Sequence, residues 1–158
     1  MKTQLLSTAV FSSSEIQIHY KRPLYDSIKS ITRANDALKV LREFSDPNRI
    51  DLKEFFWVIY LSNSNRLLAI NEISVGNALS TIVNVKEIFQ GALLTNAMGI
   101  IIAHNHPSGK LNFSNSDKQL TQRVYTLAQM MEVTLLDHLI ITSEGFTSFA
   151  NQGFFSEF

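Results

Sequence analysis

The stretch MGIIIAHNHPSGKLNFSNSD, residues 98–117, joins an apolar run to a polar loop and the start of a helix. Residues 98–104 are nearly all apolar, which is typical of a strand buried on both faces of a sheet. Pro107 ends this strand, and Gly109 lets the backbone turn. Ser114 and Asp117 form a capping-box pattern, so a helix is expected to begin near Ser114.

Two hairpins are predicted on either side of this unit. EFFWVIYL (54–61) and RLLAINEISV (66–75) are rich in aromatic and branched residues and are separated by SNSN. VTLLDHLIIT (133–142) and GFTSFA (145–150) predict a second hairpin with its turn at residues 143–145.

One helix is expected between the first hairpin and the central strand. VKEIFQGALLTN (85–96) has apolar residues at helical spacing, and these are Val85, Ile88, Phe89, Ala92 and Leu93. The order of elements predicts a mixed β-sheet flanked by helices, an α/β or α+β domain.

Residues 1–49 are predicted to form an N-terminal extension that packs on a main domain of residues 50–158. EIQIHY (15–20) alternates as a strand does. A helix through RANDALKVLREF (33–44) would begin with a cap from Thr32 or Ser30. Its expected buried face consists of Ala37, Leu38, Leu41 and Phe44.

Composition narrows the class of protein. The 158 residues are 45% apolar, which suits a folded core, and their formal net charge of zero gives no reason to expect nucleic-acid or membrane binding through bulk charge. There are no cysteines, so disulfides and thiolate metal sites are excluded. The apolar runs are shorter than a membrane span, and the N-terminus resembles a signal peptide only weakly. A cytoplasmic protein is expected.

The loop after the central strand has the residues of a metal site. Alternate strand residues point to one face, so His104 and His106 can aim both imidazoles at one point. Asp117, in the first turn of the next helix, can face them if the loop folds back. Two imidazoles and one carboxylate are a common catalytic zinc set, although iron, manganese or nickel would also suit these ligands.

A simpler interpretation competes with the metal site. Ser114 and Asp117 can serve only as a helix cap, and a His-Asn-His turn can merely satisfy backbone groups. Both interpretations hold together if Asp117 caps the helix with one carboxylate oxygen and binds metal with the other.

His-x-His-Pro followed by Ser-x-x-Asp resembles the JAMM signature of the JAB/MPN metalloprotease superfamily, and HNHPSG resembles its RadC branch. The resemblance covers roughly residues 50–153 and implies a JAB/MPN, cytidine deaminase-like architecture. It implies that His104, His106 and Asp117 bind Zn²⁺ and that Ser114 hydrogen-bonds the attacking water or the oxyanion. RadC-type loops usually have proline where this chain has Phe113, which changes loop stiffness but removes no ligand. The first fifty residues do not resemble the helix-hairpin-helix that often precedes such domains, so a short form is expected.

The resemblance also implies an upstream glutamate that acts as general base. Glu54, at the start of a strand, is the first candidate, although it would otherwise be an exposed charge at the strand edge. Glu72 is the second candidate because it shares a strand face with Leu68 and Ile70. Glu87 lies off the apolar face of its helix and is expected to be solvated.

The remaining histidines, Asn105 and an aromatic cluster are expected to have structural rather than catalytic roles. His138 is expected to be a buried structural imidazole or one that supports a ligand, and His19 a surface residue. Asn105 would orient the loop or the substrate. The aromatic cluster Phe55, Phe56, Trp57 and Tyr60 is expected in the core.

Three functions are compatible with these features. The first is a zinc hydrolase that cleaves an amide or isopeptide bond in a peptide partner. The second follows the historical DNA-repair label of RadC-type proteins and their resemblance to proteins of mobile elements; charge does not support it. The third is a scaffold without activity, which the intact ligand set argues against. Neither the substrate nor the oligomeric state follows from the sequence.

Overall fold

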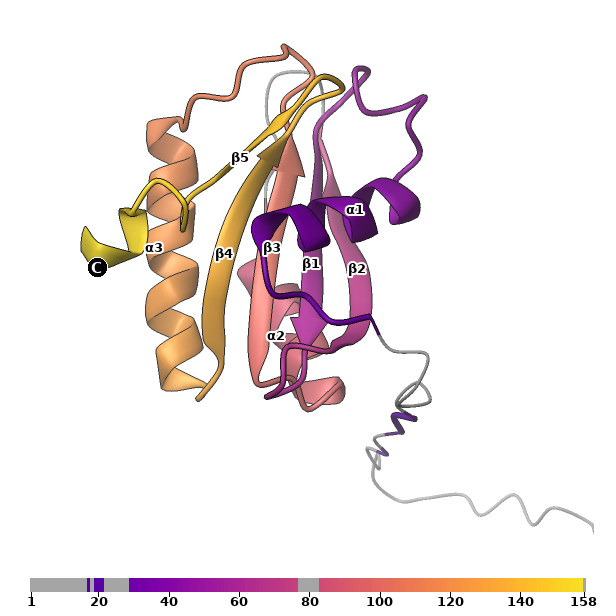
Figure 1. The fold of residues 1–158 in the computed structure, drawn as a ribbon. Coiled ribbons are helices and arrows are strands. Elements are labelled where there is room, and N and C mark those ends of the chain that lie inside the picture. The colour runs from indigo at the N-terminus through magenta and orange to yellow at the C-terminus, as the bar shows by residue number, and fades with distance from the viewer. Residues whose placement is uncertain (1–16, 18, 22–28, 77–82, 158) are drawn as a thin grey trace, which may run out of the picture.

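Five strands form one mixed sheet in the order β2-β1-β3-β4-β5 (Figure 1). The computed structural model describes residues 17, 19–21, 29–76 and 83–157. β3 and β4 are parallel, and the other neighbouring strands are antiparallel, which confirms the mixed α+β sheet and both predicted hairpins. The strands are β1 (Phe55–Leu61), β2 (Leu67–Val75), β3 (Gly99–Asn105), β4 (Thr134–Ile141) and β5 (Phe146–Ser148).

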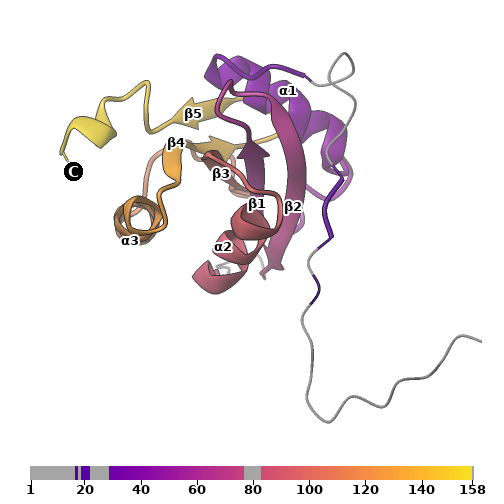
Figure 2. The same cartoon turned by 90° about the horizontal axis from the view of Figure 1, so that it is seen from below.

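Helices cover both faces of this sheet. Seen from below, α1 (Ala34–Phe44) lies on one face, while α2 (Val85–Leu94) and α3 (Asn115–Met130) lie on the other (Figure 2). A short 3-10 helix, η2 (Phe154–Glu157), follows β5. None of the helices in the described part of the chain is long and apolar enough to span a membrane.

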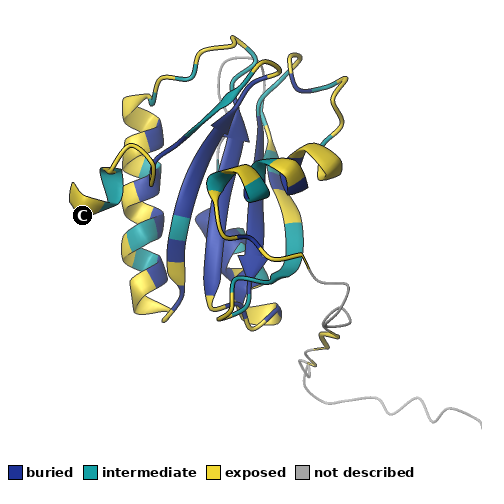
Figure 3. Ribbon diagram, in the orientation of Figure 1, coloured by how far each residue is buried: buried dark blue, intermediate teal, exposed yellow. Residues whose placement is uncertain are grey.

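Strands β1 and β3 are buried along their whole length (Figure 3). Phe56 and Tyr60 of β1 face α2 and α3 in one apolar cluster, whereas Phe55 and Trp57 face α1 in another. All four aromatic residues are at most 2% exposed, which confirms that they belong to the core. The sequence of β3 is nearly all apolar because neither of its faces meets solvent.

The N-terminal predictions are only partly met. Most of the strand expected over residues 15–20 lies outside the described residues, and the described Gln17, His19 and Tyr20 are not in a strand. His19 is exposed, as expected. The helix is present as α1, but neither Thr32 nor Ser30 is its N-cap residue. Arg33 occupies that position, and the Asp36 carboxylate reaches back to accept bonds from the Thr32 and Arg33 backbone N–H groups, each at 3.0 Å.

Two predicted core residues are instead exposed. Leu93 of α2 is 60% exposed and Phe44 of α1 is 48% exposed. Each lies in the last turn of its helix. The helical spacing of apolar residues continues there, but the residue no longer packs against the sheet. In α1 the buried residues are Ala37, Val40 and Leu41. The division of the chain at residue 49 stays a prediction, although α1 shares an apolar cluster with Trp57 and Ile59 of the sheet.

The packing of α2 on β1 leads to a stability prediction. A Cβ at Gly91 would lie 2.1 Å from the Tyr60 hydroxyl oxygen, and that ring is buried. Overpacking a core costs about 1–3 kcal/mol, which exceeds the gain of about 1 kcal/mol from alanine over glycine in a helix. We therefore expect Gly91→Ala to lower the free energy of unfolding in urea. Gly145→Ala, where the nearest atom is 3.6 Å away, is the control and should change it by less than about 0.5 kcal/mol. A Gly91→Ala protein as stable as the control would contradict this packing.

Candidate metal centre

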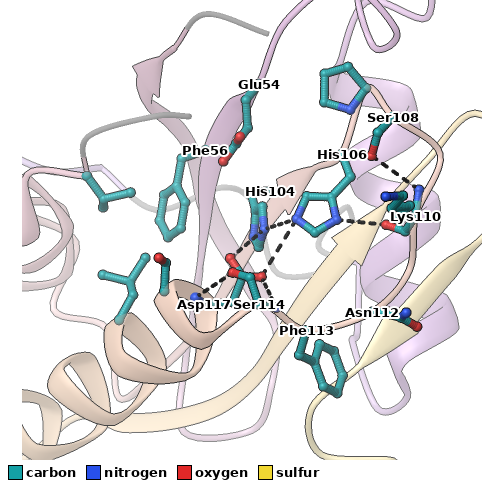
Figure 4. A pocket seen from close by; sticks show the side chains of 14 residues that line it. Glu54, Phe56, His104, His106, Ser108, Lys110, Asn112, Phe113, Ser114 and Asp117 are labelled. Atoms are coloured by element: carbon teal, nitrogen blue, oxygen red, sulfur yellow. Dashed lines mark hydrogen bonds and ion pairs between the residues drawn. The ribbon is translucent and has the colours of Figure 1, made fainter. Parts of the chain in front are cut away.

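Three elements converge at one end of the sheet. β3 ends at Asn105, and because β1 runs antiparallel to it, the start of β1 lies beside this end, with Phe56 opposite His104. The loop after β3 then leads back to α3, whose N-cap residue is Ser114. These segments enclose a cavity of about 600 Å³ (Figure 4). Its lining residues include Glu54, Phe56, Val83, His104, His106, Ser108, Lys110, Phe113, Ser114, Asp117 and Leu120.

The structure brings the three predicted ligands together. The Nε2 atoms of His104 and His106 are 3.0 Å apart. Asp117 Oδ1 lies 3.1 Å from His104 Nε2, and Asp117 Oδ2 lies 3.7 Å from His106 Nε2. One ligand atom from each residue lies within 4.8 Å of the others. His104 and Asp117 are buried, whereas His106 is partly open to the cavity.

Hydrogen bonds to the Nδ1 atoms of the two candidate ligand histidines determine which ring nitrogen faces the cavity. His106 Nδ1 lies 2.7 Å from the carbonyl oxygen of Lys110. A carbonyl only accepts, so Nδ1 carries the proton and donates. His106 Nε2 is then free to offer its lone pair to a metal.

A longer chain of bonds orients His104. Thr121 Oγ1 donates to the Asp117 carbonyl oxygen at 2.6 Å, which uses its only proton. His138 Nδ1, 2.6 Å from the same Oγ1, must then be the donor of that bond. His138 Nε2 is left to accept from His104 Nδ1 at 2.8 Å. Burial, followed by the neighbouring His104, lowers the pKa of His138, which keeps it neutral and able to accept this bond. His138 is therefore a buried imidazole that orients His104, one of the three candidate ligands.

The resulting arrangement fits a cation. Two lone pairs and one carboxylate converge on one point, and their mutual repulsion is relieved by a positive charge between them. His104 Nε2 and Asp117 Oδ1, 3.1 Å apart, are also at the distance of an ion pair. Burial would raise the pKa of Asp117, but hydrogen bonds from His104 and Ser114 outweigh burial and hold this pKa below its ordinary value. The residues present are a suitable ligand set for a divalent metal.

The helix cap and the ligand set coexist. Ser114 N–H donates to Asp117 Oδ2 at 2.7 Å, and Asp117 N–H donates to Ser114 Oγ at 3.1 Å. Both bonds of the predicted capping box are therefore present. Asp117 still directs Oδ1 towards His104. Ser114 is exposed at the cavity, and its hydroxyl proton is not used by the cap.

The three candidate glutamates lie in different places. Glu54 lines the cavity, across from His104 and His106 (Figure 4). Burial raises the pKa of Glu54; the two histidines oppose this shift, and the charge of Asp117 adds to it. Glu72 is exposed on the opposite face of the sheet, where it accepts a bond of 3.3 Å from Trp57 Nε1, a ring that packs towards α1. Glu87 pairs with Asn84 in the first turn of α2.

Several contacts of the site were not predicted from the sequence. No sequence motif marks Thr121, although its position one turn after Asp117 places it on the same side of α3. Lys110 contributes to the site through its backbone carbonyl, which accepts the bond from His106 Nδ1. No sequence pattern predicts such a backbone contact. Phe113 packs its ring on Phe149, with centroids 3.8 Å apart, and Phe149 in turn stacks on His138.

A mixed sheet that carries a His-His-Asp ligand set at the end of its central strand defines a candidate metal-binding α+β domain. The chain belongs to the RadC-like JAB domain family, whose model matches residues 31–154. A UPF0758 protein of Flavobacterium johnsoniae is 39% identical over 130 residues, which cover 81% of this chain and 55% of that protein. A UPF0758 protein of Chlorobium phaeovibrioides is 31% identical over 144 residues, covering 90% of this chain and 60% of that protein. The chain thus spans about half the length of these relatives.

Metal addition should stabilise the fold through this ligand set. A ligand that binds only the folded state at a hundred times its Kd adds about 2.7 kcal/mol, which for a chain of this size raises Tm by about 5–10 °C. We expect this rise for the unmodified protein with Zn²⁺ as the probe, and no rise for His104→Ala/His106→Ala. The rise should shrink as pH falls, since protons compete for the same atoms. An equal rise in both proteins would place the metal elsewhere.

The pKa of Glu54 predicts a cost to stability. Because the pKa of this carboxyl is raised in the folded state, the ionised form destabilises the fold, and this effect is absent at low pH and appears as pH rises through the raised pKa. In the metal-free protein, Glu54→Gln should raise Tm at pH 7 by about 1–2 °C and leave it unchanged near pH 4. The control Glu144→Gln, in an exposed turn, should change Tm at neither pH. A lower Tm for Glu54→Gln at pH 7 would contradict the sign.

Proposed function

We propose that this chain is a zinc-dependent hydrolase of the JAMM type that cleaves an amide or isopeptide bond. The observation that carries the proposal is the convergence of His104, His106 and Asp117 on one point, with Glu54 across the same cavity. Membership of the RadC-like JAB domain family and the JAMM-like motif support it. A cytoplasmic location remains part of the same proposal.

The ligand residues would hold zinc through His104 Nε2, His106 Nε2 and the Asp117 carboxylate. Zinc, when bound, supplies Lewis-acid chemistry: it lowers the pKa of water and polarises a carbonyl group. His138 and the Lys110 carbonyl keep both Nε2 lone pairs turned into the cavity, so both rings are already oriented to bind.

Glu54 would act as general base and then as general acid. Its carboxylate would take a proton from the attacking water and pass it to the leaving nitrogen. A raised pKa suits this exchange because a base is most effective when its pKa lies nearer to the working pH. The partly buried position of Glu54 is the physical origin of that pKa.

Ser114 would stabilise the oxyanion. Its Oγ accepts the Asp117 N–H, which fixes the hydroxyl at the edge of the cavity and leaves its proton to donate. A preorganised donor of this kind acts where negative charge develops on the carbonyl oxygen. The cavity also offers apolar contacts from Phe56, Val83 and Leu120, which would suit the side chains of a peptide substrate.

Elemental analysis of protein purified without a His-tag is the first test. About one zinc per chain, lost in His104→Ala/His106→Ala, is expected if this ligand set holds the metal. Absence of metal from the unmodified protein, even after zinc is offered, would contradict the proposal.

Activity should depend on Glu54 and not on Glu72. In a screen of peptide and isopeptide substrates, Glu54→Gln should lower kcat by about 10²–10⁴-fold while the zinc content stays unchanged. Glu72→Gln is the matched control, since Glu72 lies on the other face of the sheet and should leave kcat unchanged. Full activity in Glu54→Gln would rule out Glu54 as the base.

A further inference from the structure

Asn105 separates the two ligand histidines and has contacts of its own. It is fully buried, at 0% exposure. As the residue between His104 and His106, it points to the other side of the strand and away from the cavity. There its side chain meets the segment that leads into β1, some fifty residues earlier in the chain.

Each polar group of the Asn105 amide is used on this segment. Nδ2 donates to the carbonyl oxygens of Ile50 at 2.6 Å and Lys53 at 2.8 Å. Oδ1 accepts the Phe55 N–H at 2.7 Å. Two of these bonds hold the peptide groups immediately before and after Glu54. The carbonyl of Glu54 itself accepts the Gly76 N–H at 2.7 Å.

We infer that Asn105 is a positioning residue that fixes Glu54 relative to the metal ligands. The inference rests on the proposed function in taking Glu54 as the base. The register of β1 with β3 ends at the pair Phe56 and His104, so beyond that pair the Asn105 side chain links the two segments. One residue thereby connects the strand end that carries both histidines to the backbone that carries Glu54.

The amide is the group that this position requires. Two donors meet two carbonyl oxygens and one acceptor meets one N–H, so every partner is satisfied. Aspartate would keep the acceptor for Phe55 but would place a second oxygen against the two carbonyls. Alanine would leave two buried backbone groups and one partly buried carbonyl without this partner, which releases the segment around Glu54.

Amide hydrogen exchange of the metal-free protein tests the positioning itself. In Asn105→Ala, the Phe55 and Gly76 amides should exchange at least about tenfold faster relative to the Ile59 amide of central β1. Asn105→Asp is the second variant should Asn105→Ala fail to fold; it keeps the acceptor for Phe55, so its test is the Gly76 amide alone, which should exchange faster relative to Ile59. Val133→Ala is the control, because it removes buried volume from the other apolar cluster, beside the end of β3 opposite to Asn105, and should leave the ratio unchanged. Unchanged ratios in the folded Asn105 variant would overturn the inference.

Cobalt loading then tests the consequence for Glu54. With ¹³C-labelled glutamate, the resonance that disappears in Glu54→Gln belongs to Glu54. Co²⁺ should shift this resonance in the unmodified protein, and Asn105→Ala should change the shift while its Co²⁺ affinity stays within about threefold. Val133→Ala should keep the shift. An unchanged shift in Asn105→Ala would overturn the inference.

The exchange experiment and the cobalt experiment together distinguish failure of the inference from failure of the proposed function. If Glu54 has no cobalt-dependent shift in the unmodified protein, or if no Co²⁺ binds, the proposed role of Glu54 or of the metal fails. Faster exchange at Phe55 and Gly76 would still support Asn105 as the residue that fixes this segment, and unchanged exchange would overturn that as well.

Discussion

The two imidazole nitrogens that face each other 3.0 Å apart impose the main constraint on this structure. Lone pairs at this distance repel unless a cation or a proton lies between them. Hydrogen bonds at the opposite ring nitrogens fix both imidazoles. His106 Nδ1 bonds to the Lys110 carbonyl, and His104 Nδ1 bonds to His138. His138 depends in turn on Thr121 of α3. The orientation of His104 and His106 therefore depends on three parts of the chain: the loop after β3, His138 of β4 and the first turns of α3.

Strand direction explains how a distant glutamate reaches the same cavity. β1 and β3 are antiparallel neighbours, so the residues before β1 lie beside the residues after β3. Glu54 occupies the first of these segments and His106 the second. A parallel pair would have placed the start of β1 at the opposite end of the sheet. Antiparallel pairing therefore brings together two groups that lie about fifty residues apart in the sequence.

Features with local causes were the ones that the sequence could predict. The hairpins follow from branched and aromatic runs with polar turns, and the start of α3 follows from the Ser114 and Asp117 pattern. The ligand set was predictable because strand alternation and one helix start place all three residues. The chain from Thr121 through His138 to His104 was not, since it depends on how α3 packs against β4. Only the family resemblance placed Glu54 ahead of Glu72 in the sequence. Strand pairing decides which face each residue meets, and an irregularity in the β1–β2 register lies between Phe56 and Trp57.

Phe113 gives the loop its order in a different way from the proline usual at this position in RadC-type loops. Proline restricts the backbone in the unfolded chain as well as in the folded one, so its entropic benefit is local. Phe113, in contrast, orders the loop only in the folded chain, where its ring packs on Phe149 and meets Phe154 edge-on. The shape of one cavity wall is thus a tertiary property that depends on residues near the C-terminal end of the fold. Displacing these aromatic rings would loosen the wall. The C-terminal turn can therefore control how much ordering any molecule must impose when it binds in this cavity.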